Sequence, residues 1–423
     1  MNTMNVSIKQ KHAYYMFVVL LYYFLLRDFL EQRISVFSYT DEIIAVFVLP
    51  VFLLRLININ GLRFKRSKDH YWLWICIMVL SGLLGNIIYH YQPFIQAALP
   101  DLFLCIKFWL WIEVGKYLYK AFDISRYTKK IFKHIKLITW FYLGLTLLDN
   151  ILHLFPADIR HGFRSTTLFY FHPTSFAACI ILLMSILLLI RSGIEKNKFY
   201  FYEIVLSVLA CSSWRSKILG SVLLFWLIVY FALIRKKKIT VWTLLMFIPP
   251  VLLVGWEHIQ FYFLSDMIQG SPRYQLLTKS FLIAGDHLPV GAGFATFASH
   301  YSGVYYSPLY SIYGISNIEG MTATNFSYIS DSFWPMIIGQ TGLIGTMGFV
   351  VALYKLFRNI QKTRKINGTV YATGLFVMAY LLVESTSSAA FTHPIYMPIA
   401  FVIAYVLNCT RRTSAEMIRE KNT

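Results

Sequence analysis

The sequence predicts an all-α polytopic membrane protein. Of its 423 residues, 57% are hydrophobic and only 14% are charged, which is more apolar surface than a soluble core of this size could bury. The apolar residues also come in blocks of roughly twenty, the length of helix that crosses about 30 Å of hydrocarbon. Short charged connectors separate these blocks.

About twelve such blocks follow one another along the chain. The first has no small-residue cleavage site and is expected to be retained as a span. No internal repeat or linker divides the chain, so we expect one transmembrane domain over residues 1–423. The expected spans cover residues 13–30, 41–57, 71–88, 98–118, 136–153, 170–190, 200–214, 218–234, 239–259, 331–352, 368–386 and 395–410.

The basic residues indicate an orientation for these spans. The formal net charge is +19, but most Lys and Arg residues lie in connectors, which favours membrane topology over a nucleic-acid partner. If both termini are cytoplasmic, most connector Lys and Arg residues lie on the inner face, as the positive-inside rule requires. The opposite orientation would reverse that bias. The segment 260–330, between the ninth and tenth spans, is then one large external loop.

This external loop is the longest polar interruption of the chain, and we expect it to carry function. A short amphipathic helix is predicted over residues 274–284, after Pro272, with Arg273 and Lys279 exposed near the lipid headgroups. The rest of the segment is rich in Gly, Ser and Tyr and is predicted to be loop.

A few basic residues on the expected outer face are not explained by topology. Arginine presents a donor fork that fits phosphate oxygens, so their convergence would form a site for a lipid-linked phosphate or diphosphate. The alternative for each one is contact with lipid headgroups or pairing with an outer acid such as Asp158, Asp266 or Asp286. Arg215 is the strongest candidate, because it is wedged between two apolar runs and needs an anion nearby. The residues concerned are Arg160, Arg164, Arg215, Lys217, Arg273 and Lys279.

Four other ionisable residues are candidates for the same site. Asp331 begins the tenth span, where its carboxylate could take a proton from a hydroxyl or cap the helix. His287 could be a base, a phosphate donor or a structural loop residue. Glu384 and Lys107 lie at membrane depth, as cavity-lining residues or as members of intramembrane pairs.

Two further features of the sequence, its His-Pro dipeptides and its cysteines, do not point to a catalytic or metal-binding role. The dipeptides His172-Pro173 and His393-Pro394 mark breaks at the ends of spans, where structural roles are expected. The five cysteines lie in apolar blocks without metal-type spacing, and no other metal-ligand cluster is present in the sequence. We therefore expect no metal and no other cofactor.

Four short motifs within residues 160–345 resemble the superfamily of O-antigen ligases and Wzy-type polysaccharide polymerases, as does the late external loop. Asp331-Ser332 stands where the ligases carry His-Asn, which makes the chain more similar to the polymerases. Trp214 and Leu288 are insertions relative to the family pattern. The motifs are Ser213-Trp214-Arg215-Ser216, Arg273 followed by His287 to Phe294, Arg164 to Ala177, and Gln340-Thr341-Gly342-Leu343-Ile344-Gly345.

The resemblance implies a glycosyltransferase on the outer face of the bacterial plasma membrane. It would transfer a growing glycan from undecaprenyl diphosphate to the sugar hydroxyl of a lipid-linked repeat unit, without a metal and with inversion. The implied partners are these lipid-linked oligosaccharides and membrane lipids, with a chain-length regulator and a flippase as further candidates. The implied catalytic residues are Asp331, Arg273 and Arg215, with Arg164, Lys217, Lys279, His287 and Glu384 binding diphosphate or glycan.

Three alternatives stay open. A glycan ligase would use the same donor with another acceptor, and the missing His-Asn argues against it. A lipid-linked oligosaccharide flippase would share the span number and the basic residues, but flippases are commonly built from two similar halves, which this sequence lacks. A small-molecule transporter is the general alternative for any chain with about a dozen spans.

Overall fold

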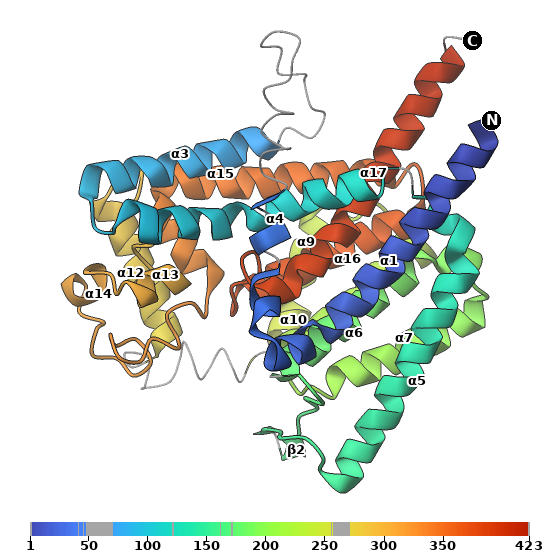
Figure 1. The fold of residues 1–423 in the computed structure, drawn as a ribbon, viewed down its shortest axis with the longest axis horizontal. Coiled ribbons are helices and arrows are strands. Elements are labelled where there is room, and N and C mark those ends of the chain that lie inside the picture. The colour runs from blue at the N-terminus through green and yellow to red at the C-terminus, as the bar shows by residue number, and fades with distance from the viewer. Residues whose placement is uncertain are drawn as a thin grey trace.

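A computed structural model describes residues 2–40, 42–44, 46–47, 71–120, 122–160, 162–170, 172–254, 256 and 271–421. These residues form a bundle of helices in which both chain termini point to the same side, and one short hairpin lies at the opposite side (Figure 1). The α-helices are α1 (Asn2–Arg33), α3 (Tyr71–Tyr89), α4 (Leu99–Leu118), α5 (Thr128–Leu152), α6 (Pro173–Leu189), α7 (Lys196–Cys211), α8 (Ser216–Val229), α9 (Val241–Met246), α10 (Ile248–Val254), α12 (Pro272–Asp286), α13 (His300–Val304), α14 (Leu309–Ile312), α15 (Phe333–Thr363), α16 (Gly368–Ser385) and α17 (Met397–Lys421). The hairpin pairs β1 (Ile159–Arg160) with β2 (Phe163–Arg164).

The expected fold class, an all-α membrane protein, is confirmed. Within the described residues, seven helical segments are long and apolar enough to cross a membrane, and three shorter ones are apolar. Of the expected span 41–57, only residues 42–44 and 46–47 lie within the described part of the chain. The seven segments are Gln10–Arg33, Tyr71–Tyr89, Phe94–Leu118, Ile124–Leu152, Ser216–Ile234, Phe333–Thr363 and Gly368–Ser385.

Two helices form the centre of the bundle. Every residue of α6 is buried, and nearly all of α16 is buried as well. The outward faces of α3 and α5 expose large apolar side chains such as Leu80 and Ile151, as expected for helices that contact lipid. His172 directly precedes the N-terminus of α6, and Glu384 lies in the last turn of α16.

The ninth expected span, 239–259, is not one continuous helix. The structure has two short helices, α9 and α10, that meet at Phe247. Pro249 and Pro250 lack the N–H groups that would bond the carbonyls of Leu245 and Met246, so the first helix ends there. Residues 255 and 257–270 lie outside the described part of the chain, as does the start of the expected external loop.

The rest of the expected loop is folded into the protein. The helix predicted after Pro272 is present as α12, with Pro272 in its first turn. It packs along α15 and buries Leu276 and Ile283, so one of its faces contacts protein. The Gly-rich stretch 290–298 is buried throughout. It forms irregular loop without helix or strand, as predicted, and the loop is packed inside the protein because Gly and Ser allow close backbone packing.

Helix α15 is interrupted at Gly342, which has a left-handed φ of 61°. This break frees the carbonyls of Gly339 and Gln340, which then accept hydrogen bonds from the N–H groups of Ala292 (3.0 Å) and Gly293 (2.9 Å). Two of the motifs identified in the sequence therefore meet as a buried backbone joint. The amide of Asn86, on α3, holds the same segment by donating to the carbonyl of Phe294 and accepting from its N–H.

Candidate functional site

Charged residues from distant parts of the chain meet at one end of the bundle. Arg215 and Arg273, which are 58 residues apart, lie close enough that the charge of Arg273 contributes to the lowered pKa of Arg215. Asp331 contacts Arg273 and also lies within electrostatic range of Lys217. We call the whole group the polar cluster. It consists of Asp158, Arg160, His172, Arg215, Lys217, Arg273, Asp331 and Glu384.

Arg215 is held between a carboxylate and an imidazole. It is the N-cap residue of α8, and its Nη2 donates to Asp158 Oδ2 at 2.8 Å and faces His172 Nε2 at 2.9 Å. Its side chain is only 11% exposed, whereas that of Asp158 is 57% exposed. Partial burial and the charge of Arg160 lower the pKa of Arg215 to about 10, against the pull of Asp158, so the guanidinium remains charged at pH 7.

Lys217 reaches a carboxylate in the protein interior. Its Nζ lies 2.8 Å from Glu384 Oε2, and the Glu384 side chain is completely buried. Tyr396 donates its hydroxyl to the same oxygen at 2.6 Å. The sequence left open whether Glu384 lines a cavity or forms an intramembrane pair, and the structure has the pair. Glu384 thereby fixes the position of Lys217 in the polar cluster.

Arg273 and Asp331 form the third charged contact, with Nη2 to Oδ2 at 3.2 Å. Asp331 is not the helix cap, because Ser332 occupies that position and α15 begins at Phe333. Burial raises the pKa of the Asp331 carboxyl above its usual range, and the charges of Arg273 and Lys217 oppose this effect. A carboxylate in this environment is a competent proton acceptor near neutral pH.

Three predicted site residues have no described contact with the polar cluster. Arg164 pairs with the buried Asp149 at 3.1 Å and donates to the carbonyl of Phe155, so it holds the segment before the hairpin. Lys279 is half-buried on α12. His287 lies at the other end of α12, about 20 Å from Arg273 along the helix axis, where its Nδ1 contacts Ile283 O and its Nε2 contacts the Tyr91 hydroxyl.

Lys107, the other intramembrane candidate, also lies in a pair of its own. It is completely buried in α4, and its Nζ contacts Glu42 Oε1 at 2.6 Å. Lys107 is therefore a member of an intramembrane pair, which is one of the two interpretations that the sequence left open.

His172 is the residue whose position the sequence did not predict. It was interpreted as a structural residue before Pro173, and it does cap α6, because its Nδ1 accepts from Thr174 N at 3.1 Å. The same ring also reaches Arg215. The signal available in the sequence was the His-Pro pair itself, since a histidine that caps with Nδ1 has Nε2 left for another contact.

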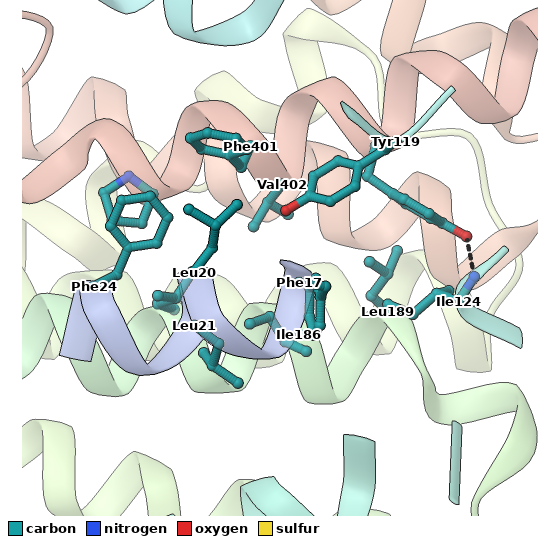
Figure 2. A pocket seen from close by; sticks show the side chains of 13 residues that line it. Phe17, Leu20, Leu21, Phe24, Tyr119, Ile124, Ile186, Leu189, Phe401 and Val402 are labelled. Atoms are coloured by element: carbon teal, nitrogen blue, oxygen red, sulfur yellow. Dashed lines mark hydrogen bonds between the residues drawn. The ribbon is translucent and has the colours of Figure 1, made fainter. Parts of the chain in front are cut away.

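An apolar groove lies between α1, α6 and α17 (Figure 2). A smaller hollow shares Phe24, Leu182 and Pro398 with it and continues to Arg27 and Asp28. The Asp28 side chain hydrogen-bonds Ser175 in the first turn of α6, so the polar end of this path is about one helical turn from His172. The groove is lined by Phe17, Leu20, Leu21, Phe24, Tyr119, Ile124, Leu182, Ile186, Leu189, Pro398, Phe401, Val402 and Tyr405.

The fold and the polar cluster together define a helical membrane protein with a charged site at one end of its bundle. No protein-family model matches the chain, and no curated protein matches it. Among the described residues, no three His, Cys, Asp or Glu side chains are grouped so that they could hold a metal ion.

Proposed function

We propose that this protein is a membrane glycosyltransferase that polymerises lipid-linked oligosaccharide repeat units. The observation that carries the proposal is the meeting of Arg215, Arg273 and Asp331, which come from three separate segments of the chain, in one polar cluster. The family resemblance assigned the diphosphate to the two arginines and the acceptor hydroxyl to the carboxylate. A diphosphate leaving group needs cations such as the two arginines, and an acceptor hydroxyl needs a proton acceptor such as the carboxylate of Asp331.

The reaction follows from these groups. The hydroxyl oxygen of the acceptor sugar forms a bond to the anomeric carbon of the donor glycan, and the bond from that carbon to the lipid diphosphate breaks. The diphosphate leaves with the electron pair, while the hydroxyl proton passes to Asp331. Arg215, Arg273 and Lys217 stabilise the negative charge that develops on the leaving group, which is the main electrostatic requirement of such a step.

The apolar groove supports a lipid-linked substrate. Its walls are almost wholly apolar, and its continuation passes Asp28 and approaches the first turn of α6, next to the polar cluster. This arrangement suits an amphiphile better than a water-soluble substrate.

The proposal includes the expected topology. Both termini lie in the cytoplasm, about twelve spans cross the bacterial plasma membrane, and the polar cluster faces outward. In support, residues 154–165, 214–217 and 386–394, which the charge bias assigns to the outer face, lie at or next to the polar cluster through Asp158, Arg215 and Glu384.

The test is polymerisation by the purified protein. Lipid-linked repeat units are incubated with the full-length chain in micelles, with no other enzyme, and the products are separated by size. A ladder of products that lengthens with time is the expected result. Transfer to a different lipid acceptor without a ladder would identify a ligase, and movement of lipid-linked units across vesicles without bond formation would identify a flippase. Either outcome would replace the proposal.

A further inference from the structure

Both ring nitrogens of His172 face hydrogen-bond donors. Nδ1 lies 3.1 Å from the backbone nitrogen of Thr174, which carries a hydrogen. Nε2 lies 2.9 Å from Nη2 of Arg215, and a guanidinium nitrogen can only donate. A ring that satisfied both neighbours would need two acceptor nitrogens and therefore no proton at all.

A neutral imidazole cannot meet that requirement. Partial burial of the ring, together with the charges of Arg215 and Lys217, lowers the pKa of His172 to about 4, so the ring is neutral at pH 7 and carries one proton. That proton points at a donor whichever nitrogen holds it. The N–H of the His172 ring therefore lacks an acceptor unless a further acceptor group binds beside it, or unless Thr174 or Arg215 moves.

The helix start decides where the proton lies. Pro173 has no N–H, so Thr174 carries the first backbone donor of α6, and Nδ1 of His172 is the acceptor that caps it. The cap is kept only if Nδ1 is unprotonated. The proton is then on Nε2 and points toward Arg215, where two donors converge on one position.

We propose that His172, through its Nε2–H, and Arg215 donate together to one oxygen of a phosphate or diphosphate group. The inference rests on the proposed function for the identity of that anion, and it adds His172 to the residues that bind it. The ring acts as a neutral hydrogen-bond donor in this role and does not serve as a base.

The surroundings of His172 suit an anion. Its charged neighbours are Arg215, the N-cap of α8, Lys217 in the first turn of α8, Asp158 just before the hairpin, and Arg160 in β1. Nε of Arg215 is buried and has no hydrogen-bond partner among the described residues, so the guanidinium has a donor to spare. Asp158 is the exposed partner, which an entering anion can displace from Arg215.

Asparagine and glutamine separate the two roles of His172. Asparagine is among the best capping residues, and its amide ends near the position of Nδ1, so His172→Asn keeps the cap and removes the distal donor. Glutamine extends an N–H group to about the position of Nε2. His393 is the matched control, because it also precedes a proline and caps its segment with Nδ1, which accepts from Ile395 N.

Binding is measured on the full-length protein in micelles by calorimetry, with inorganic diphosphate as one probe and a polyprenyl diphosphate as the other. We expect His172→Asn to weaken binding about ten-fold or more, the effect of losing a hydrogen bond to a charged group, with an unchanged thermal midpoint. His172→Gln should recover part of the affinity, and His393→Asn should bind as the wild type does. Weakening with the polyprenyl probe alone would identify the lipid-borne anion as the ligand.

Histidine-labelled protein gives an independent measurement of the tautomer. Nitrogen-15 spectra should assign the His172 proton to Nε2 when diphosphate is bound. The inference is overturned if the proton is on Nδ1, or if His172→Asn binds both probes as tightly as the wild type does. These outcomes are separate from the polymerisation assay. A ladder from a variant with unchanged binding would reject the inference alone, and weakened binding without any wild-type ladder would reject the proposed function alone.

Discussion

Gly291 and Gly342 lie in direct backbone contact, although 50 residues of sequence separate them. A Cβ atom added to Gly291 would lie 2.3 Å from the backbone nitrogen of Gly342, and one added to Gly342 would lie 2.4 Å from the nitrogen of Gly291. Both residues also have left-handed φ angles, 81° and 61°. The joint between the buried loop and the break in α15 therefore requires glycine on both sides.

The first prediction concerns the stability of this joint. Gly291→Ala and Gly342→Ala should each lower the free energy of unfolding by about 2 to 4 kcal/mol, because backbone atoms must separate and a left-handed residue is strained. Thermal unfolding in micelles measures the effect. Gly144→Ala on α5 is the control, since a Cβ there meets nothing within 4 Å, and it should be neutral or slightly stabilising. Equal unfolding midpoints for all three variants would contradict the requirement for glycine at positions 291 and 342.

The second prediction concerns Arg273. Arg273→Ala should reduce the rate of chain growth by about 10² to 10³, the loss that follows removal of one oriented donor to a developing negative charge. Arg273→Lys should recover little of the rate, because lysine lacks the planar fork. The rate is measured from the product ladder. Arg358→Ala is the control, because Arg358 is an exposed arginine late in α15. Full activity of Arg273→Ala would remove this residue from the site.

The third prediction concerns the pH dependence of the reaction. Asp331 must be ionised to accept the hydroxyl proton, and burial raises the pKa of its carboxyl above the ordinary value of 3.8. Activity should therefore be present above that raised pKa and fall as the pH drops through it. Lys217→Gln removes a charge that lowers this pKa, so its acid limb should move to higher pH. Rate profiles between pH 4 and 8 test both statements, and an unshifted limb in Lys217→Gln would argue against Asp331 as the base.

The sequence predicted the broad fold because span length and apolar composition are local properties. It also placed Arg215, Arg273 and Asp331 on one expected outer face, and in the structure Asp331 contacts Arg273 and the charge of Arg273 acts on Arg215. The burial of residues 290–298 could not be predicted in the same way, because it depends on backbone contacts with Gln340 and Asn86 far along the chain. Periodicity carries no information about such contacts.

The individual roles of charged residues were harder to predict for the same reason. Arg164 and Arg215 look alike in the sequence, since each lies near the outer end of an apolar block. The structure distinguishes them by their partners: a buried aspartate for Arg164, and an exposed aspartate together with a histidine for Arg215. Whether the partner carboxylate is buried or exposed depends on the tertiary structure, so the sequence alone does not distinguish the two arginines.

The fourth prediction follows from that difference. Arg164→Ala leaves Asp149 buried without its cation, so stability should fall by about 3 kcal/mol or more, while the protein that remains folded should keep its affinity for diphosphate. Arg164→Ala combined with Asp149→Asn removes both charges and should be more stable than Arg164→Ala alone. Thermal midpoints and diphosphate calorimetry on the same samples test this. If the folded fraction of Arg164→Ala bound diphosphate more weakly than the wild type, Arg164 would be a substrate-binding residue after all.

The fifth prediction concerns the buried pair of Lys217 and Glu384. Glu384→Gln leaves the Lys217 ammonium, which is only 19% exposed, without its counter-charge, and removing one member of such a pair costs about 3 to 5 kcal/mol. Lys217→Met combined with Glu384→Gln should recover much of that stability and still form the product ladder more slowly than the wild type, because one of the three cations assigned to the leaving group is absent. A double-mutant cycle on unfolding midpoints measures the coupling, and ladder formation measures function. If the double variant recovered activity together with stability, Lys217 would be a purely structural residue.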